Sequence, residues 1–322
     1  MTFLSSLARR AGATGSRIGF PEAHEERTLE AMRRLQGSGL RPVAVGHGEA
    51  VTGAASDGLE VLDLSAEQVR DAARPHLTPE GELTAPVPLA MALALLRAGQ
   101  LDGVVAGAEA ATADVLRAGL CVLGPKPEIR TVSSAFYMVI GELDQAGEKG
   151  ERVLTFTDAA VVPDPTADQL AEIAVAASDA RRVIVGDEPR VAFLSYSTAG
   201  SAEGASVSKA RAAAELFRTL RPDVVADGEL QADAALDRAV AQRKSPGSAL
   251  EGTANILVFP NLDAANIGYK LVERLADARA VGPILQGLAG ALNDLSRGAS
   301  IDDIVRVSYV TALMADTTQE QT

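Results

Sequence analysis

The most unusual segment of the sequence runs from Gly287 to Asp303 and has the sequence GLAGALNDLSRGASIDD. Its arginine could bind an anion, its carboxylates could accept a proton, and its serine could donate a hydrogen bond. Capping explains part of the pattern, because Ser300 is a good helix N-cap and Asp303, three residues later, can complete a capping box. Capping leaves Ser296 and Arg297 unexplained, so a structural and a chemical interpretation both stay open.

Two further segments combine a strand, a loop of small residues and a helix. In Ser195–Gly204 (SYSTAGSAEG) the small residues would let backbone N–H groups approach an anion at the start of the next helix. The spacing of a P-loop is absent, and a plain flexible loop explains the segment equally well. In Gly107–Leu120 (GAEAATADVLRAGL), Arg117 follows Asp114 at the spacing of a surface ion pair, which is the ordinary interpretation.

The other reactive side chains favour structural interpretations. Arg70, Arg74 and Arg130 are expected to be solvated charges. The single cysteine, Cys121, lies in an apolar run, which predicts a buried small hydrophobe rather than a nucleophile. One cysteine and three scattered histidines, which we expect at the surface, predict no metal site.

Composition narrows the classes of partner. The chain has 322 residues, of which 43 are acidic and 30 basic, and the resulting net charge of −13 argues against nucleic-acid binding. The longest apolar run, Ala85–Leu96, contains prolines and is well short of the ~20 residues that a membrane span needs. The N-terminus lacks the charged-then-apolar order of a secretory signal. We therefore expect a soluble, cytoplasmic protein that binds neither nucleic acid nor membrane.

Short β-branched runs alternate with amphipathic stretches along most of the chain. The strands are expected at 17–20, 42–45, 59–62, 103–106, 131–139, 153–156, 191–195, 224–227 and 256–259. The helices are expected at 25–35, 66–73, 89–96, 112–120, 167–177, 206–220, 232–242, 264–275 and 301–314. This alternation predicts an α/β fold with doubly wound parallel sheets, whose ligands bind at the carboxyl ends of the strands. The polar stretch Glu142–Arg152 could be a domain boundary or a long hairpin loop.

Taken together, these segments make the chain resemble the phosphate acetyl/butyryl transferase family. The likeness extends from about residue 3 to about residue 315. Four stretches carry it: 191–201 (VAFLSYSTAGS), 227–235 (DGELQADAA), 254–270 (ANILVFPNLDAANIGYK) and 282–303 (GPILQGLAGALNDLSRGASIDD). NDLSRG together with DGELQ is a specific combination.

The resemblance implies reversible transfer of an acetyl group between coenzyme A and inorganic phosphate, with acetyl phosphate as the product in one direction. It implies two α/β domains with the active-site cleft between them, usually in a homodimer. Domain one would be residues 1–140 plus 288–322, completed by the C-terminal helices, and domain two residues 141–287. Coenzyme A and acetyl-coenzyme A would be substrates, and no tightly bound cofactor or metal is implied.

The family's site residues are carried over position by position. Its catalytic serine, arginine and aspartate match Ser296, Arg297 and Asp303. Its arginine in the helix after the small-residue loop matches Arg117, and a further one most resembles Arg74, with Arg70 as the other candidate. Substrate binding is also assigned to the small-residue loop of the second domain, at Ser197, Thr198, Gly200 and Ser201.

The chain departs from the family pattern in two loops. Gly290-Ala291 replaces the usual Lys-Pro before NDLSRG, and Ala110-Ala111 replaces a His-Ser/Thr pair before Arg117. These departures leave alternatives open: a phosphate butyryltransferase, or a catalytically silent acyl-coenzyme A sensor. A metal- and NAD-dependent hydroxyacid dehydrogenase is disfavoured, because the sequence shows neither its metal-binding aspartates nor a nicotinamide site.

The implied chemistry suits these residues. The coenzyme supplies the nucleophilic thiol, so the protein needs no cysteine. A free thiol has a pKa near ~8.5 and an aspartate near ~3.9, so complete proton transfer to Asp303 would cost roughly 6 kcal/mol. Asp303 is therefore expected to take the proton as the S–C bond forms. Ser296 is expected to donate a hydrogen bond to the developing charge, because no histidine lies near it in sequence to activate it as a nucleophile.

Overall fold

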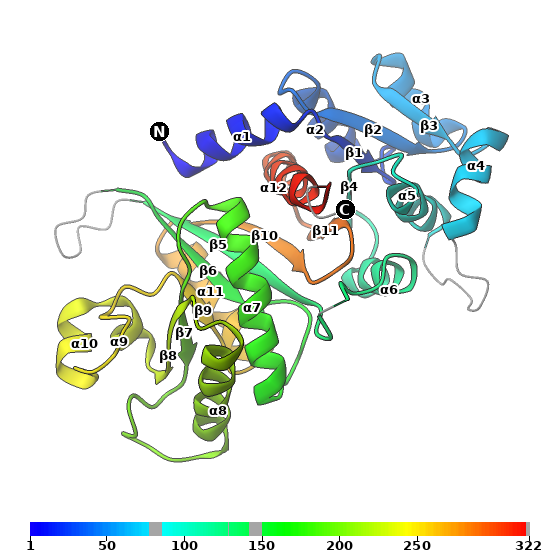
Figure 1. Ribbon diagram of the computed structural model, residues 1–322. Coiled ribbons are helices and arrows are strands. Elements are labelled where there is room, and N and C mark those ends of the chain that lie inside the picture. Colours follow the sequence, from blue (N-terminus) through cyan, green and yellow to red (C-terminus); the bar gives the residue numbers. More distant parts are fainter. Residues whose placement is uncertain (77–85, 128, 142–149, 320–322) are drawn as a thin grey trace. The chain divides into compact units, whose positions relative to one another are not determined.

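The computed structural model describes residues 1–76, 86–127, 129–141 and 150–319, which form two compact units (Figure 1). Unit one consists of Met1–Glu128 and Gly282–Thr322, and unit two of Ile129–Val281. Both ends of the chain therefore build unit one. None of the helices in the described part of the chain is long and apolar enough to cross a membrane.

Unit one contains a five-stranded sheet in the order β11-β4-β1-β2-β3, and its neighbouring strands pair in parallel. The strands are β1 (Arg17–Phe20), β2 (Arg41–Gly46), β3 (Glu60–Asp63), β4 (Gly103–Ala106) and β11 (Ala291–Asp294). The helices are α1 (Phe3–Thr14), α2 (Glu26–Gln36), α3 (Glu49–Ser56), α4 (Glu67–Ala73), α5 (Val87–Arg97), α6 (Thr112–Val122) and α12 (Ile301–Gln319), with a 3-10 turn at Arg74–His76.

Helices cover both faces of this sheet. The C-terminal helix α12 packs on β1, β4 and β11 together with α1 and α2, and α5 and α6 pack on each other and on β4 and β11 (Figure 1). Because both faces are covered, β4 is buried at all four positions. A strand that is apolar on both sides is typical of a parallel sheet between two helical layers.

A six-stranded sheet has the order β10-β5-β6-β9-β7-β8 and belongs to unit two, except that its edge strand β10 runs across the boundary of the units at Gly282. The strands are β5 (Ser133–Ile140), β6 (Arg152–Thr157), β7 (Arg190–Leu194), β8 (Val225–Leu230), β9 (Ile256–Val258) and β10 (Arg279–Gln286). The helices are α7 (Ala167–Ile184), α8 (Ala205–Leu220), α9 (Ala232–Leu236), α10 (Arg238–Lys244) and α11 (Leu262–Leu275). The pair β5–β6 is antiparallel, and the pairs among β6, β9, β7 and β8 are parallel.

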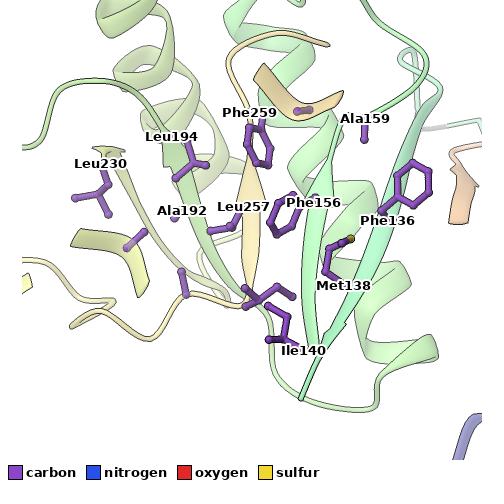
Figure 2. Packing of buried hydrophobic residues seen from close by; sticks show 14 of the residues in the cluster. Phe136, Met138, Ile140, Phe156, Ala159, Ala192, Leu194, Leu230, Leu257 and Phe259 are labelled. Atoms are coloured by element: carbon purple, nitrogen blue, oxygen red, sulfur yellow. The ribbon is translucent and has the colours of Figure 1, made fainter. Parts of the chain in front are cut away.

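Two apolar clusters hold this sheet between its helices. On one side α7 and α8 pack on Val191, Phe193 and Ile256. On the other side Phe156 and Phe259 lie 5.1 Å apart between ring centroids, surrounded by the residues drawn in Figure 2. Aromatic pairs at this separation contribute about 0.5–1.5 kcal/mol beyond the area that they bury. The α/β fold with two doubly wound sheets is thus confirmed, and the second sheet also contains the antiparallel pair β5–β6.

All predicted strands and helices overlap an observed element, but some elements were not predicted. Helices α1 and α3 and strands β10 and β11 are missing from the prediction. The predicted helix 232–242 is two helices, because Asp237 adopts an extended conformation and caps α10 by accepting from the Val240 N–H. An N-cap residue has non-helical dihedral angles, so the first helix ends there.

The boundaries of the units differ from the predicted domain boundaries. Unit one ends at residue 128 and resumes at 282, whereas the sequence prediction placed these boundaries at 140 and 288. The reason is strand β5, which pairs with β6 and so belongs to the second sheet. The stretch 142–152 joins these two antiparallel strands and is not the boundary between the units; its residues 142–149 lie outside the described residues.

Candidate active site

Three loops meet at one edge of the sheet of unit one. They follow β1, β4 and β11, which are adjacent and parallel, so that their carboxyl ends share an edge. The chain builds β2 and β3 on one side of β1, then returns to build β4 and later β11 on the other. Such a reversal is where open α/β sheets bind ligands. The structure therefore directs attention to residues 21–25, 107–111 and 295–300.

The loop after β11 presents Ser296 and Arg297 to solvent, while Leu295 before them is buried. The Ser296 hydroxyl accepts a hydrogen bond from the Gly298 N–H at 3.3 Å. Within residues 1–76, 86–127, 129–141 and 150–319, the Arg297 guanidinium pairs with no carboxylate. An exposed guanidinium without a partner, in a chain with excess carboxylates, is available to grip the oxygens of an anionic ligand.

The loop after β4 already holds an anion, which is the side chain of Glu22. Oε2 of Glu22 accepts from the N–H groups of Gly107 at 2.9 Å and Ala108 at 2.7 Å. Oε1 accepts from those of Glu109 at 3.3 Å and Ala110 at 2.8 Å. The backbone N–H groups that such a loop could offer to a ligand are therefore occupied by the protein's own carboxylate, and the loop is tied to β1.

Arg27 ties the Ser296–Arg297 loop to its neighbours. Its Nη1 donates to the carbonyl oxygens of Arg297 at 3.0 Å and Ala299 at 2.7 Å, and its Nη2 donates to that of Ala108 at 3.2 Å. Its Nε donates to Glu25 Oε1 at 2.7 Å. One side chain on α2 thus fixes two of the three loops. The sequence analysis missed both Glu22 and Arg27, and only the proximity of each to the end of β1 could have suggested them.

Asp303 forms the capping box that its spacing predicts. Its Oδ2 accepts from the Ser300 N–H at 3.0 Å and from the Ser300 hydroxyl at 2.7 Å. The Asp303 N–H donates to Ser300 Oγ at 3.2 Å, and Asp303 Oδ1 accepts from Arg306 at 3.0 Å. Both carboxylate oxygens therefore have partners within the protein, and a role in proton transfer would use an oxygen that leaves one of them.

The other arginines assigned from the resemblance lie on helical segments of unit one, and their assignment stays a prediction. Arg117, on α6, is half-exposed and pairs with Asp114 at 2.7 Å, as the spacing predicts. Arg74, in the 3-10 turn after α4, is 75% exposed and pairs with Asp71 at 3.2 Å, and Arg70 is exposed as well.

The small-residue loop in unit two is closed on itself by a buried carboxylate. Oε1 of Glu229 accepts from Ser197 Oγ at 2.9 Å and from the Gly200 N–H at 2.8 Å, and its Oε2 accepts from Arg211 at 2.9 Å. Burial alone would raise the pKa of Glu229, but Arg211 and these hydrogen bonds outweigh it and lower the pKa to about 2. The carboxylate stays ionised at neutral pH and occupies the loop.

Within this loop the Thr198 N–H donates to Ser201 Oγ at 3.0 Å. The backbone N–H groups of Thr198 and Gly200 thus have acceptors inside the protein, which are Ser201 Oγ and the Glu229 carboxylate. The assignment of Ser197, Thr198, Gly200 and Ser201 to substrate binding stays a prediction.

Cys121 is exposed, so the prediction of a buried cysteine is wrong. It lies near the end of α6, at a position that faces away from the helix's buried residues Val115, Ala118 and Val122. An apolar run in the sequence does not reveal which of its residues face solvent. Among the described residues, no group of three His, Cys, Asp or Glu side chains is arranged to hold a metal ion.

Comparison with known proteins assigns this arrangement to a family. The profile of the family described as phosphate acetyl/butaryl transferase matches residues 2–312. The phosphate acetyltransferase of Treponema pallidum is 41% identical over 98% of this chain and 99% of its own length. That of Paracoccus denitrificans is 42% identical over 96% and 98%. The crystal structure of a phosphotransacetylase from Streptococcus pyogenes is 33% identical, with a TM-score of 0.85 and 98% of each chain covered.

Proposed function

Since the chain belongs to the phosphate acetyl/butaryl transferase family, we propose that it catalyses the reversible transfer of an acetyl group between acetyl-coenzyme A and inorganic phosphate. The chain is an enzyme of the transferase class. One observation supports the proposal: Ser296 and Arg297, which pairs with no carboxylate among the described residues, are exposed together at the sheet edge where the strand order of unit one reverses.

In the direction of acetyl-coenzyme A synthesis, the coenzyme thiol attacks the carbonyl carbon of acetyl phosphate. The S–C bond forms, the C–O bond to phosphate breaks, and inorganic phosphate leaves. Arg297 grips the phosphate oxygens with two parallel hydrogen bonds and balances the charge that develops on them. Ser296 donates a hydrogen bond from its hydroxyl to the carbonyl oxygen as that oxygen becomes negative.

The proton of the thiol goes to Asp303 in this proposal. Asp303 must accept the proton as the S–C bond forms. A free thiolate plus a protonated aspartate would lie roughly 6 kcal/mol higher in free energy than the thiol plus the ionised aspartate. The Arg306 guanidinium, 3.0 Å from Asp303 Oδ1, can hold the carboxylate in a fixed orientation before the reaction. The coenzyme acts as a substrate, and we propose no tightly bound cofactor and no metal.

A thiol-release assay tests the function directly. Purified protein, acetyl-coenzyme A and phosphate should liberate free thiol, and the rate should depend on phosphate. If folded protein at high substrate releases thiol no faster than the reaction without protein, the silent sensor would be favoured. The same assay with butyryl-coenzyme A measures acyl preference, and a higher kcat/KM for butyryl than for acetyl would favour the butyryltransferase.

Replacing Arg27 by lysine should slow the reaction without unfolding the protein. Lysine keeps the positive charge but cannot donate at once to the carbonyl oxygens of Arg297, Ala299 and Ala108. The loop with Ser296 should then lose its position, and kcat should fall by about 10-fold or more. Thermal unfolding provides the check, because a variant that is slow only through partial unfolding would show a large loss of melting temperature.

We also propose that the protein is a cytoplasmic homodimer that pairs through α11. Ile267, Leu271 and Leu275 are exposed there at a spacing of four residues, 59%, 52% and 82% respectively. Rows with this spacing interdigitate when two helices pack, so an identical copy can cover the row. Leu271→Glu should shift the protein from dimer to monomer in light scattering. Lys270→Glu, about 100° away around the helix axis, should leave the mass unchanged.

A further inference from the structure

Asp294, the last residue of β11, is a fully buried carboxyl group directly before the Ser296–Arg297 loop. Its Oδ2 lies 2.6 Å from the hydroxyl of Thr112, the first residue of α6. Its Oδ1 is buried and has no hydrogen-bond partner among the described residues. An unpaired carboxyl oxygen in a protein interior is costly and calls for an explanation.

The loop after β4 is shaped to admit this side chain. Gly107 has a φ of +102°, and a methyl group added there would overlap Asp294 Oδ1 and the backbone of Leu295. Glycine is therefore required for the backbone to pass this close to the end of β11. The same loop receives the carboxylate of Glu22, so two acidic side chains approach it from different strands.

Among the residues that the structure describes, no cation offsets the charge that Asp294 would carry if ionised. From the loop after β1 it faces Glu22, a second carboxylate. Arg117 on α6 pairs with Asp114, Arg306 on α12 pairs with Asp303, and the Arg27 guanidinium binds carbonyl oxygens and Glu25. Burial raises the pKa of Asp294 to about 7, with Glu22 acting in the same direction and the Thr112 hydroxyl opposing it. The group therefore keeps its proton below neutrality.

We propose that Asp294 is a positioning residue for acetyl transfer, which holds the Ser296–Arg297 loop in place by joining the end of β11 to α6 through Thr112. The inference rests on the proposed function, because the loop that it positions is the proposed catalytic loop. Arg27 fixes the far side of that loop through the carbonyl oxygens of Arg297 and Ala299. Asp294 and Thr112 fix its near side. Ionisation of Asp294 strengthens the hydrogen bond from Thr112 but sets two carboxylates beside each other, and the repulsion from Glu22 pushes the end of β11 away from the loop after β4.

Variants of Thr112 test the attachment. Thr112→Val removes the hydroxyl at nearly constant shape, and we expect kcat to fall by about 10-fold or more with KM for both substrates changed by less than about threefold. Thr112→Ser restores the hydroxyl and should recover most of kcat. A valine variant with the parental kcat, or a serine variant as slow as the valine variant, would overturn the proposal.

The pH dependence of Asp294→Asn tests the carboxyl itself. Asparagine cannot ionise, whereas the parent loses its proton near neutrality. The ratio of variant to parent kcat cancels the ionisations of the substrates, and it should rise by about tenfold from pH 6 to pH 8. A ratio that stays flat over this range contradicts the proposal, even if the variant is less stable.

Stability gives a readout that does not depend on turnover. The folded parent holds the Asp294 proton to higher pH than the unfolded chain does, so its stability falls as pH rises from about 4 to about 7. The melting temperature of Asp294→Asn minus that of the parent should therefore increase from pH 4 to pH 7. A constant difference in melting temperature would show that Asp294 is ionised throughout.

If the parent shows no thiol release, the proposed function fails, and hydrogen exchange still tests the attachment. Thr112→Val should then speed amide exchange at residues 295–300, and unchanged exchange there would overturn it. Parental turnover combined with variants that change exchange or melting but not kcat would leave Asp294 with a purely structural role and refute the inference.

Discussion

Replacing Arg297 with glutamine is expected to lower kcat/KM for phosphate by about 10²- to 10³-fold and to leave the melting temperature almost unchanged. Glutamine keeps a hydrogen-bond donor on a shorter side chain but loses the charge and the fork of the guanidinium. The side chain is exposed and pairs with no carboxylate in the described part of the chain. Its replacement should therefore change the free energy of unfolding little. Steady-state kinetics and thermal unfolding measure the two effects separately.

A matched control distinguishes local chemistry from the loss of one positive charge. Arg243→Gln on α10 makes the same change of charge at another exposed arginine of the described residues, in unit two. It should have parental kinetics and parental melting. A large loss of melting temperature in Arg297→Gln with nearly normal kinetics would refute the assignment of Arg297 to substrate.

Local signals predicted most of the fold. Strands such as β1 and β4 are short apolar runs next to turn residues, and their predicted ranges coincide with the observed ones. Strand β11 has the sequence ALND, and its last two residues are polar, so periodicity could not identify it. Those polar residues are buried because Asn293 and Asp294 bond to Thr311 and Thr112, far away in the sequence.

In the candidate site, too, the sequence predicted local contacts but not contacts between residues far apart in the chain. The capping box of Ser300 and Asp303 follows from a spacing of three residues, and the structure contains it. The contacts of Arg27 with Arg297 and Ala299 span about 270 residues of sequence, and no pattern in the chain predicts them. The resemblance to a family singled out Ser296 and Arg297, but the residues that hold their loop became visible only in three dimensions.

The loop 195–204 shows the same limit of sequence patterns. Small residues between a strand and a helix do favour anion binding, and in the structure an anion does occupy the loop. The anion is the carboxylate of Glu229, which arrives from β8. In unit one Glu22 occupies the loop after β4 in the same way. A sequence pattern can show that N–H groups are exposed by the backbone, but not whether a side chain from another strand already binds them.

Asp303→Asn should separate catalysis from capping, because the structure gives Asp303 a complete capping role. Asparagine keeps a side-chain oxygen that can accept from the Ser300 N–H, and it loses only a partly exposed pair with Arg306. If the role of Asp303 is purely structural, the substitution should lower the free energy of unfolding by at most about 1 kcal/mol and reduce activity little.

As a general base, Asp303 cannot be replaced by asparagine, because an amide does not accept the thiol proton at neutral pH. The rate of acetyl-coenzyme A synthesis should then fall by about 10²-fold or more at neutral pH. Raising the pH toward the thiol pKa of ~8.5 should restore part of the rate, because solution then supplies thiolate. Asp302→Asn is the matched control, since Asp302 precedes it, is more exposed and pairs with Arg34 and Arg306. If Asp303→Asn stays within a few-fold of the parent, or if the two variants lose equal activity, Asp303 is a helix cap alone and the thiol proton leaves by another route.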